Sequence, residues 1–256
     1  MVVGLDIFGA HFSEYCDRYV LIGGAACSLA MAEAGLGFRT TKDLDIVLCV
    51  ETLDSSFVAA FWEFIHKGGY RYRECSSGRK QYYRFHKPEV SGYPQMLELF
   101  ARVPDALPPT STSHLTPIPT GDDLSSLSAI LLSDDYYHFL QGGRRETRGL
   151  SYVGPEHLLP LKAKAWLDLS ERRLQGEDID SRSLRKHKND FFRLYPILNP
   201  ALGGKVPDSI KHDLRKFLAC METEIIDLKS LGLKSATRES ILADLGRIYG
   251  LRQTPE

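Results

Sequence analysis

Apolar residues recur along the chain at two spacings, and the mixture of the two changes near residue 150. Before that point, short apolar runs that suit buried strands alternate with stretches in which apolar residues recur every three or four positions, as on one face of a helix. Beyond Pro155 only the helical spacing remains. The pattern predicts an α/β domain over 1–150, with a mixed sheet and flanking helices, followed by a C-terminal helical bundle over 151–256.

The first part is predicted to alternate between helices and strands. Apolar residues from Leu5 to Tyr15 lie at helical spacing, and Asp54 is a typical N-cap for a later helix. Gly and Pro mark the breaks between these stretches. The expected strands are 19–22, 43–50, 70–74, 81–86 and 95–101, with a helix ending near 34, a surface loop at 104–121 and a hairpin from 127–132 to 136–140.

Four helices are predicted in the second part. Pro155 suits the first position of a helix that continues to about residue 174, and Asp180 with Ser181 caps another that continues to about 198. A third helix is expected to begin at 207–209, and a fourth covers 235–251.

Composition and charge exclude several classes of protein. With 43% hydrophobic and 25% charged residues, the chain is neither disordered nor of low complexity. Lys and Arg number 32 against 33 Asp and Glu, so binding of nucleic acid or membrane by bulk charge is excluded, although a local basic patch is not. No apolar run approaches the ~20 residues of a membrane span, no signal peptide is expected, and five scattered cysteines suit reduced thiols. We expect a soluble cytoplasmic protein.

Two aspartates, Asp43 and Asp45, stand two residues apart at the start of a predicted strand. Alternate residues of a strand share one face, about 6.6 Å apart, so these carboxylates can share a divalent cation such as Mg²⁺. Glu98, the acid centred in a later strand, is expected to complete a two-metal site. If the strand extends toward its N-terminus, Arg39 and Thr41 share the acid face and orient the acids or bind nucleotide. The alternatives are a polar strand start and an Arg39 salt bridge.

A glycine pair, Gly23 and Gly24, separates the strand 19–22 from an Ala-rich helix. This arrangement places free backbone N–H groups and the positive end of a helix dipole where a phosphate can bind. Glycine is suited to the position because a Cβ would keep the phosphate away from the backbone. A simple tight turn is the alternative. The dinucleotide-binding and P-loop motifs are absent.

In combination these residues resemble the nucleotidyltransferase superfamily with the polymerase-β-like fold. The chain is most similar to the nucleotidyltransferases of AbiE-type (type IV) toxin–antitoxin systems and related proteins, over roughly residues 19–198. It departs from the family pattern at the third acid, which is Glu98 rather than Asp. The segments that carry the resemblance are Gly23–Ala26, Arg39–Asp45, Leu159–Ala165 and Lys188–Asp190.

The resemblance implies transfer of a nucleoside monophosphate from a nucleoside triphosphate (NTP) to a hydroxyl or phosphate acceptor. Asp43, Asp45 and Glu98 would hold two Mg²⁺ ions, and Gly23 and Gly24 would hold the β- and γ-phosphates. It further implies RNA, such as a tRNA end, as acceptor and a cognate antitoxin as partner. A small-molecule nucleotidyltransferase of the antibiotic-modifying kind and a non-catalytic nucleotide- or partner-binding protein stay open as alternatives.

Lys162 lies on the apolar face of the predicted helix 155–174, in line with Leu158 and Trp166. A lysine on an inward face needs an anionic partner or a wet cleft. We expect a bound triphosphate to supply that anion, and the family resemblance independently favours the same lysine as a catalytic and nucleotide-binding residue. Asp190 is expected to accompany Lys162 and to orient it when no nucleotide is bound. The alternative is a lysine that snorkels from the core edge.

Basic and aromatic residues interleave between Tyr70 and Lys87, a segment that includes Arg84. Such a segment suits the phosphates and stacked bases of RNA. Two solvated strands are an equally good interpretation, because aromatic residues are good strand formers. The basic run 182–188 is interpreted as the solvated face of a helix.

Overall fold

The computed structural model describes residues 2–49, 51–52, 54–71, 82–100, 133–200 and 206–251. The chain divides into two compact units. The first comprises Met1–Leu124 with Arg144–Gly154, and the second comprises Ser125–Gly143 with Pro155–Glu256. Each unit contains a segment from the other side of the predicted boundary near residue 150. The division into domains 1–150 and 151–256 stays a prediction.

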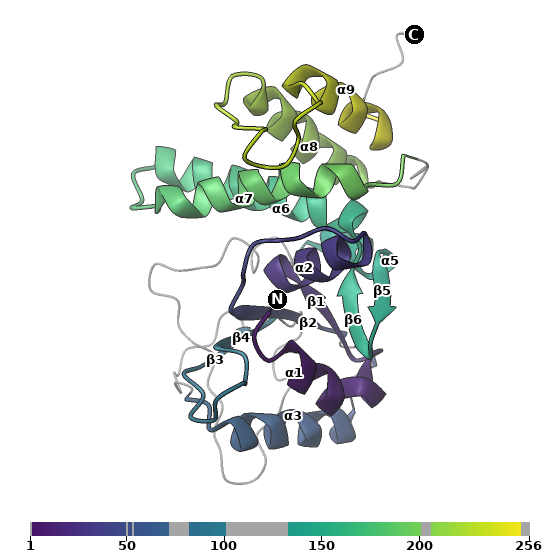
Figure 1. The fold of residues 1–256 in the computed structure, drawn as a ribbon, viewed down its shortest axis with the longest axis vertical. Coiled ribbons are helices and arrows are strands. Elements are labelled where there is room, and N and C mark those ends of the chain that lie inside the picture. Colours follow the sequence, from purple (N-terminus) through teal and green to yellow (C-terminus); the bar gives the residue numbers. More distant parts are fainter. Residues whose placement is uncertain are drawn as a thin grey trace. The chain divides into compact units, whose positions relative to one another are not determined.

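A mixed six-stranded sheet forms the first unit, in the order β3-β4-β2-β1-β6-β5 (Figure 1). Next to the central β1, β2 is antiparallel and β6 is parallel, and β4 is parallel to β2. The predicted α/β class, with a mixed sheet and flanking helices, is confirmed. The strands are β1 (Tyr19–Ile22), β2 (Asp43–Leu48), β3 (Tyr82–His86), β4 (Met96–Phe100), β5 (Arg144–Thr147) and β6 (Leu150–Val153).

Three α-helices cover the sheet, with α2 (Gly23–Glu33) on one face and α1 (Leu5–Phe12) and α3 (Ser55–Gly68) on the other (Figure 1). An aromatic core joins α1 to α3: the Phe12 and Phe64 ring centroids lie 5.3 Å apart, and both side chains are fully buried. A short 3₁₀ turn, Ser13–Tyr15, follows α1 and leads into β1.

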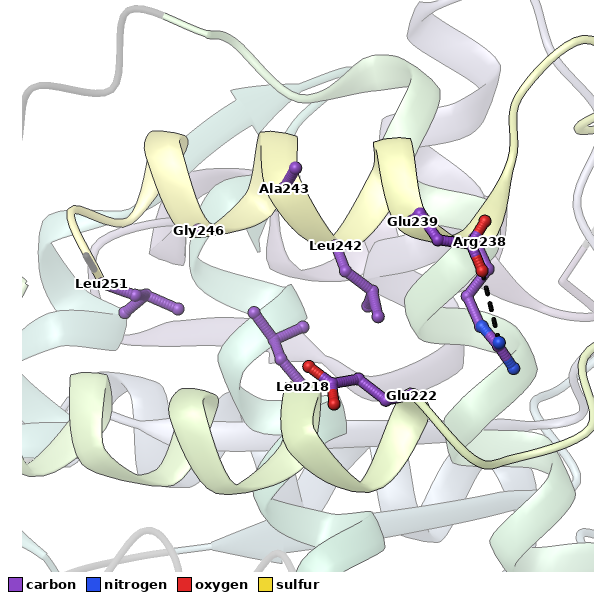
Figure 2. Close-up of a pocket in the computed structure, with 8 residues that line it drawn as sticks. All are labelled: Leu218, Glu222, Arg238, Glu239, Leu242, Ala243, Gly246 and Leu251. Carbon is purple, nitrogen blue, oxygen red and sulfur yellow. Dashed lines mark ion pairs between the residues drawn. The ribbon is translucent and has the colours of Figure 1, made fainter.

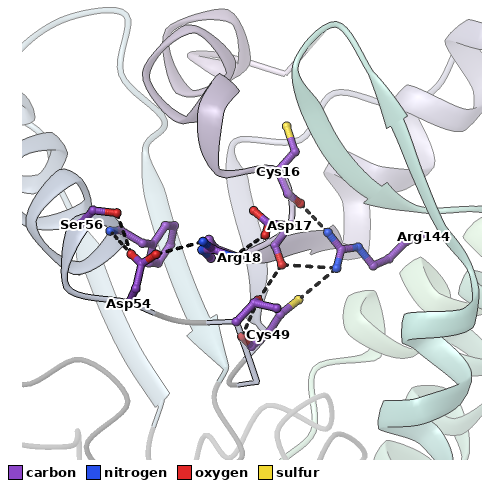
Figure 3. Close-up of polar contacts among 9 residues, drawn as sticks. Cys16, Asp17, Arg18, Cys49, Asp54, Ser56 and Arg144 are labelled. Atoms are coloured by element: carbon purple, nitrogen blue, oxygen red, sulfur yellow. Dashed lines mark hydrogen bonds and ion pairs between the residues drawn. The ribbon is translucent and has the colours of Figure 1, made fainter.

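A polar cluster fixes the loops at the start of β1 and the end of β2 (Figure 3). Arg144 donates a hydrogen bond to the Cys16 carbonyl oxygen at 2.5 Å. Arg18 pairs with Asp54 at 2.9 Å, and the same carboxylate accepts the Phe57 backbone N–H and caps α3, as the sequence predicts. The cluster has a structural role at the opposite end of these strands from Asp45.

The second unit consists of helices, as the sequence predicts (Figure 1). Trp166, Phe191 and Phe217 pack in its core, with ring centroids 4.4 to 5.4 Å apart. Asp180 caps the second predicted helix by accepting the Arg182 backbone N–H. The helices are α5 (Asp134–Gly142), α6 (Pro155–Leu174), α7 (Ser181–Leu194), α8 (Asp208–Met221) and α9 (Arg238–Ile248), with a 3₁₀ turn at Tyr195–Ile197 after α7.

The predicted hairpin from 127–132 to 136–140 is wrong in its second strand, which is helical. Residues 136–140 belong to α5, where Tyr136, Tyr137 and Leu140 are buried at helical spacing. The polar residues Ser133, Asp134 and Asp135, which suit a hairpin turn, instead form the N-cap and first turn of this helix. Residues 127–132 lie outside the described part of the chain.

The sequence analysis missed the hairpin of β5 and β6. Its two-residue turn is Arg148-Gly149, with φ of 51° and 72°, a pair of positive φ angles typical of a tight hairpin turn. All four β6 residues are buried, so the strand lacks the alternation that reveals a half-buried strand.

Some predicted elements lie wholly or partly outside the described residues. The loop 104–121 and residues 72–74 of the strand 70–74 are in this group, whereas Arg71 forms a bridge with His86. No helix in the described ranges is both long and apolar enough for a membrane span. The described cysteines, Cys16, Cys27, Cys49 and Cys220, carry free thiols.

Candidate active site

Three charged side chains form a row across three neighbouring strands. Asp45 on β2 lies opposite Glu98 on β4, and Glu98 lies opposite Arg84 on β3. On the other side of Asp45 the register places Ile22, after which Gly23 begins α2. Residues paired directly across strands project to the same face of a sheet. The row Arg84, Glu98, Asp45 therefore leads to the N-terminus of α2.

Glu98 is a buried acid that is held between a cation and another acid. Arg84 contacts its Oε1 through Nε at 2.7 Å and through Nη2 at 2.6 Å, and the Glu98 side chain is 10% exposed. Burial and the adjacent Asp45 carboxylate raise the pKa of Glu98 to about 7, against the lowering effect of Arg84. When protonated, Glu98 hydrogen-bonds to Asp45. Near neutral pH, Glu98 is therefore an acid that can hold or release a proton next to the Asp45 carboxyl group.

Gly23 and Gly24 leave room for two side chains that approach them closely. One side chain comes from β2 and the other from the segment before β2. Gly23 has φ of 63°, and a Cβ there would lie 1.7 Å from Oδ2 of Asp45. A Cβ on Gly24 would lie 2.8 Å from Oγ1 of Thr41. Asp45 thus rests against the first turn of α2, where the helix dipole favours a negative charge. The phosphate-binding role of the two glycines stays a prediction.

The strand does not extend through Arg39 and Thr41, so the prediction that strand alternation places them on the acid face is wrong. β2 begins at Asp43 because its partner β4 begins opposite, at Met96. Thr41 is nevertheless buried, at 7% exposure, beside Gly24. The Arg39 guanidinium lies over the Phe38 ring, 5.4 Å from its centroid.

Asp45 and Glu98 fit the requirements of a Mg²⁺ ion, which binds one or two carboxylates together with substrate phosphates and water. Their carboxyl groups are adjacent, and both could supply oxygen ligands. Asp43 shares their face of the sheet and is half-buried. Within the residues that the structure describes, no three His, Cys, Asp or Glu side chains are gathered into a metal-binding group. The two-metal site formed by all three acids stays a prediction.

Lys162 and Asp190 form a buried ion pair inside the helical unit. The Lys162 Nζ lies 3.2 Å from Oδ2 of Asp190, and the two side chains are 5% and 0% exposed. Arg193 lies 3.8 Å from the other oxygen of Asp190. Asp190 thus supplies the anionic partner that an inward lysine requires. The contact of Lys162 with a triphosphate stays a prediction.

Two hollows in the second unit contain none of the predicted site residues. One, of about 560 Å³, lies between α8 and α9, where Leu218 and Leu242 point toward each other and the Arg238–Glu239 ion pair lies to one side (Figure 2). The other, of about 510 Å³, is lined by residues of α6 and α7, including Trp166. The carboxyl pair of the sheet is the stronger candidate for chemistry because it brings two acids together, one of them buried and paired with the Arg84 cation.

Sequence analysis missed the position of Arg84 in the site. The residue was part of the interleaved basic and aromatic segment, which gave no reason to separate it from its neighbours. One signal was present: Arg84 is a charged residue centred in a predicted strand, as is Glu98. Such residues require partners on adjacent strands.

Comparisons with known proteins give one structural similarity. No family model and no curated protein matches the chain. Among solved structures, the chain is similar to an antigenic nucleotidyltransferase-like protein from Paracoccidioides brasiliensis, with 18% identity and a TM-score of 0.46. The similarity covers 93% of this chain and 96% of the other.

Proposed function

We propose that this protein is a Mg²⁺-dependent nucleotidyltransferase. The observation that carries the proposal is the carboxyl pair of half-buried Asp45 and buried Glu98, beside the first turn of α2. Two ionised carboxylates in contact repel each other, so a fold gains no stability from placing them together. The arrangement is useful where a divalent cation and an anionic phosphate meet, next to a helix N-terminus that attracts phosphate.

The reaction moves a nucleoside monophosphate to an acceptor. An acceptor oxygen attacks the α-phosphorus of an NTP, the bond from that phosphorus to the bridging oxygen breaks, and pyrophosphate leaves with the electron pair. The proton of an acceptor hydroxyl passes to a carboxylate of the pair. Asp43, Asp45 and Glu98 would hold Mg²⁺, which when bound neutralises charge on the entering and leaving oxygens.

The remaining predicted residues belong to substrate binding in this proposal. Gly23, Gly24 and Thr41 border the phosphates, and Lys162 supplies a cation that Asp190 orients. Arg39 contacts the nucleotide. The family resemblance supports RNA, such as a tRNA end, as the acceptor, a cognate antitoxin as the partner and a cytoplasmic location.

Incubation of the protein with each α-³²P-labelled NTP, Mg²⁺ and total RNA tests the proposal. We expect labelled RNA, and a loss of at least about a hundredfold in rate for Asp45→Asn, equivalent to about 2.7 kcal/mol of transition-state stabilisation. Asp6→Asn, which changes an exposed acid of the same unit, is the matched control and should keep the parent rate.

Other outcomes separate the alternatives. A labelled small molecule in place of RNA would identify a small-molecule nucleotidyltransferase. Binding of NTP without release of pyrophosphate, under every condition, would identify a non-catalytic nucleotide-binding protein. Full activity of Asp45→Asn would contradict the proposed site.

A further inference from the structure

Among the described basic residues of their segment, Arg84 and Arg71 have partners of different kinds. The Arg84 guanidinium makes both of its contacts with Oε1 of Glu98, at 2.6 and 2.7 Å. Arg71 lies near the same edge of the sheet and pairs with Glu89 at 3.9 Å, but those side chains are 67% and 70% exposed. Arg84 is thus the cation that faces the carboxyl pair, whereas Arg71 belongs to a solvated surface.

The burial of this ion pair is unequal at its two ends. The Glu98 side chain is 10% exposed and the Arg84 side chain is 32% exposed. Arg84 comes from β3, the edge strand, and reaches inward to the row. In Lys162–Asp190, by contrast, both ends are buried. A change of side-chain rotamer can therefore move the Arg84 guanidinium into solvent without opening the core, which is impossible for Lys162.

The Arg84 guanidinium occupies Oε1 of Glu98, one of the carboxylate oxygens that a divalent cation at this pair would use. The row contains one positive and two negative formal charges when both acids are ionised. A guanidinium satisfies one carboxylate through directed hydrogen bonds, whereas Mg²⁺ requires oxygen ligands in its own geometry. The two cations also repel each other at this separation. A cation that takes Oε1 of Glu98 must therefore displace Arg84.

We propose that Arg84 is an exchangeable counter-ion of the carboxyl pair: it holds Glu98 while no divalent cation is bound and releases it when a cation binds. This inference rests on the proposed function to the extent that the function requires a cation at Asp45 and Glu98. Arg84 is a positioning residue here, because it acts through Glu98. The exchange implies that a divalent cation binds weakly to the protein alone and more tightly once nucleotide phosphates supply further ligands.

Binding of Mn²⁺ to the full-length protein without nucleotide, followed by electron paramagnetic resonance, tests the inference. Arg84→Gln removes the competing charge, so its Kd for Mn²⁺ should be at least tenfold lower than that of the parent. Arg71→Gln is the matched control and should keep the parent Kd. Asp45→Asn in the Arg84→Gln background should abolish the gain, because the ion binds at the carboxyl pair.

Unchanged or weaker Mn²⁺ binding by Arg84→Gln, or a gain that survives Asp45→Asn, overturns the inference. If Arg84→Gln does not fold, Arg84→Lys replaces it: a single ammonium holds Glu98 less firmly, so a threefold lower Kd supports the inference and an unchanged Kd overturns it.

The inference and the proposed function fail in different ways. Nucleotidyl transfer by the parent together with an unchanged Kd in Arg84→Gln overturns only the inference. Tighter Mn²⁺ binding by Arg84→Gln without any transfer by the parent upholds the exchange and overturns the transferase proposal.

Discussion

At the scale of single residues, the position of the Asp45 side chain requires glycine at position 23. The Asp45 carboxylate occupies the space that a side chain at position 23 would need. Gly23 also has a positive φ, which residues with a Cβ adopt only at a cost. Two separate constraints, conformation and contact, therefore act on one glycine.

Gly23→Ala should destabilise the first unit by about 2–5 kcal/mol, because the left-handed backbone costs about 1–2 kcal/mol and overpacking adds about 1–3 kcal/mol. Denaturant unfolding measures the loss. Gly35→Ala is the control for backbone strain alone, since Gly35 has φ of 70° with open space around it.

The double variant Gly23→Ala/Asp45→Ala isolates the contact. We expect it to recover the part of the loss that exceeds the loss in Gly35→Ala. Equal losses in the two single glycine variants would contradict a contact between Asp45 and position 23.

At the scale of elements, two ion pairs on α6 differ in burial. They are therefore expected to differ in how much the loss of one partner lowers the free energy of unfolding. Lys162–Asp190 is almost fully buried, whereas Lys164–Asp213 has side chains that are 34% and 13% exposed. Both lysines lie on the same helix two residues apart. They form a natural pair for comparing a buried charge with a partly solvated one.

Lys162→Met should lower the free energy of unfolding by about 3–5 kcal/mol, because it removes a buried cation that pairs with the fully buried Asp190 carboxylate. Lys164→Met should lower it by about 1 kcal/mol or less. Urea unfolding of both variants gives the comparison. Similar losses would show that burial of Lys162 does not set the strength of its pair.

Elements with one clear periodicity could be predicted from the sequence, and elements with ambiguous periodicity could not. The α6 and α3 helices have strong start signals at Pro155 and Asp54, and both were predicted at their observed starts. The α5 helix was mistaken for a strand, and the fully buried β6 was missed. Both errors concern short segments whose apolar spacing fits more than one element.

The candidate site was partly predictable for a related reason. The acids Asp45 and Glu98 stand out as charges inside apolar strands, and strand register then brings them together. The pairing of Glu98 with Arg84 depends on which strand lies beside β4, a non-local fact that spacing along the chain does not contain.

At the scale of the whole molecule, each unit contains one of the two tryptophans. Trp62 lies on α3 of the first unit and Trp166 on α6 of the second, and they are 2% and 8% exposed. Replacing either one by Phe leaves a single fluorescent reporter in one unit.

We expect Gly23→Ala to lower the urea midpoint reported by Trp62 and to leave the midpoint reported by Trp166 unchanged, because each unit has its own hydrophobic core. The measurement uses Gly23→Ala in the Trp62→Phe and Trp166→Phe backgrounds. A common shift of both midpoints would show that the units unfold as one.

The β5–β6 hairpin has a consequence for how such a chain can be divided or recombined. It supplies two strands to the sheet, yet it lies in the chain between α5 and α6 of the helical unit. A cut before α5 removes β6 from its place beside β1, and a cut after β6 separates α5 from α6. A gene fusion or truncation with one breakpoint between α5 and α6 therefore damages at least one unit, and exchange of either unit between genes needs more than one crossover.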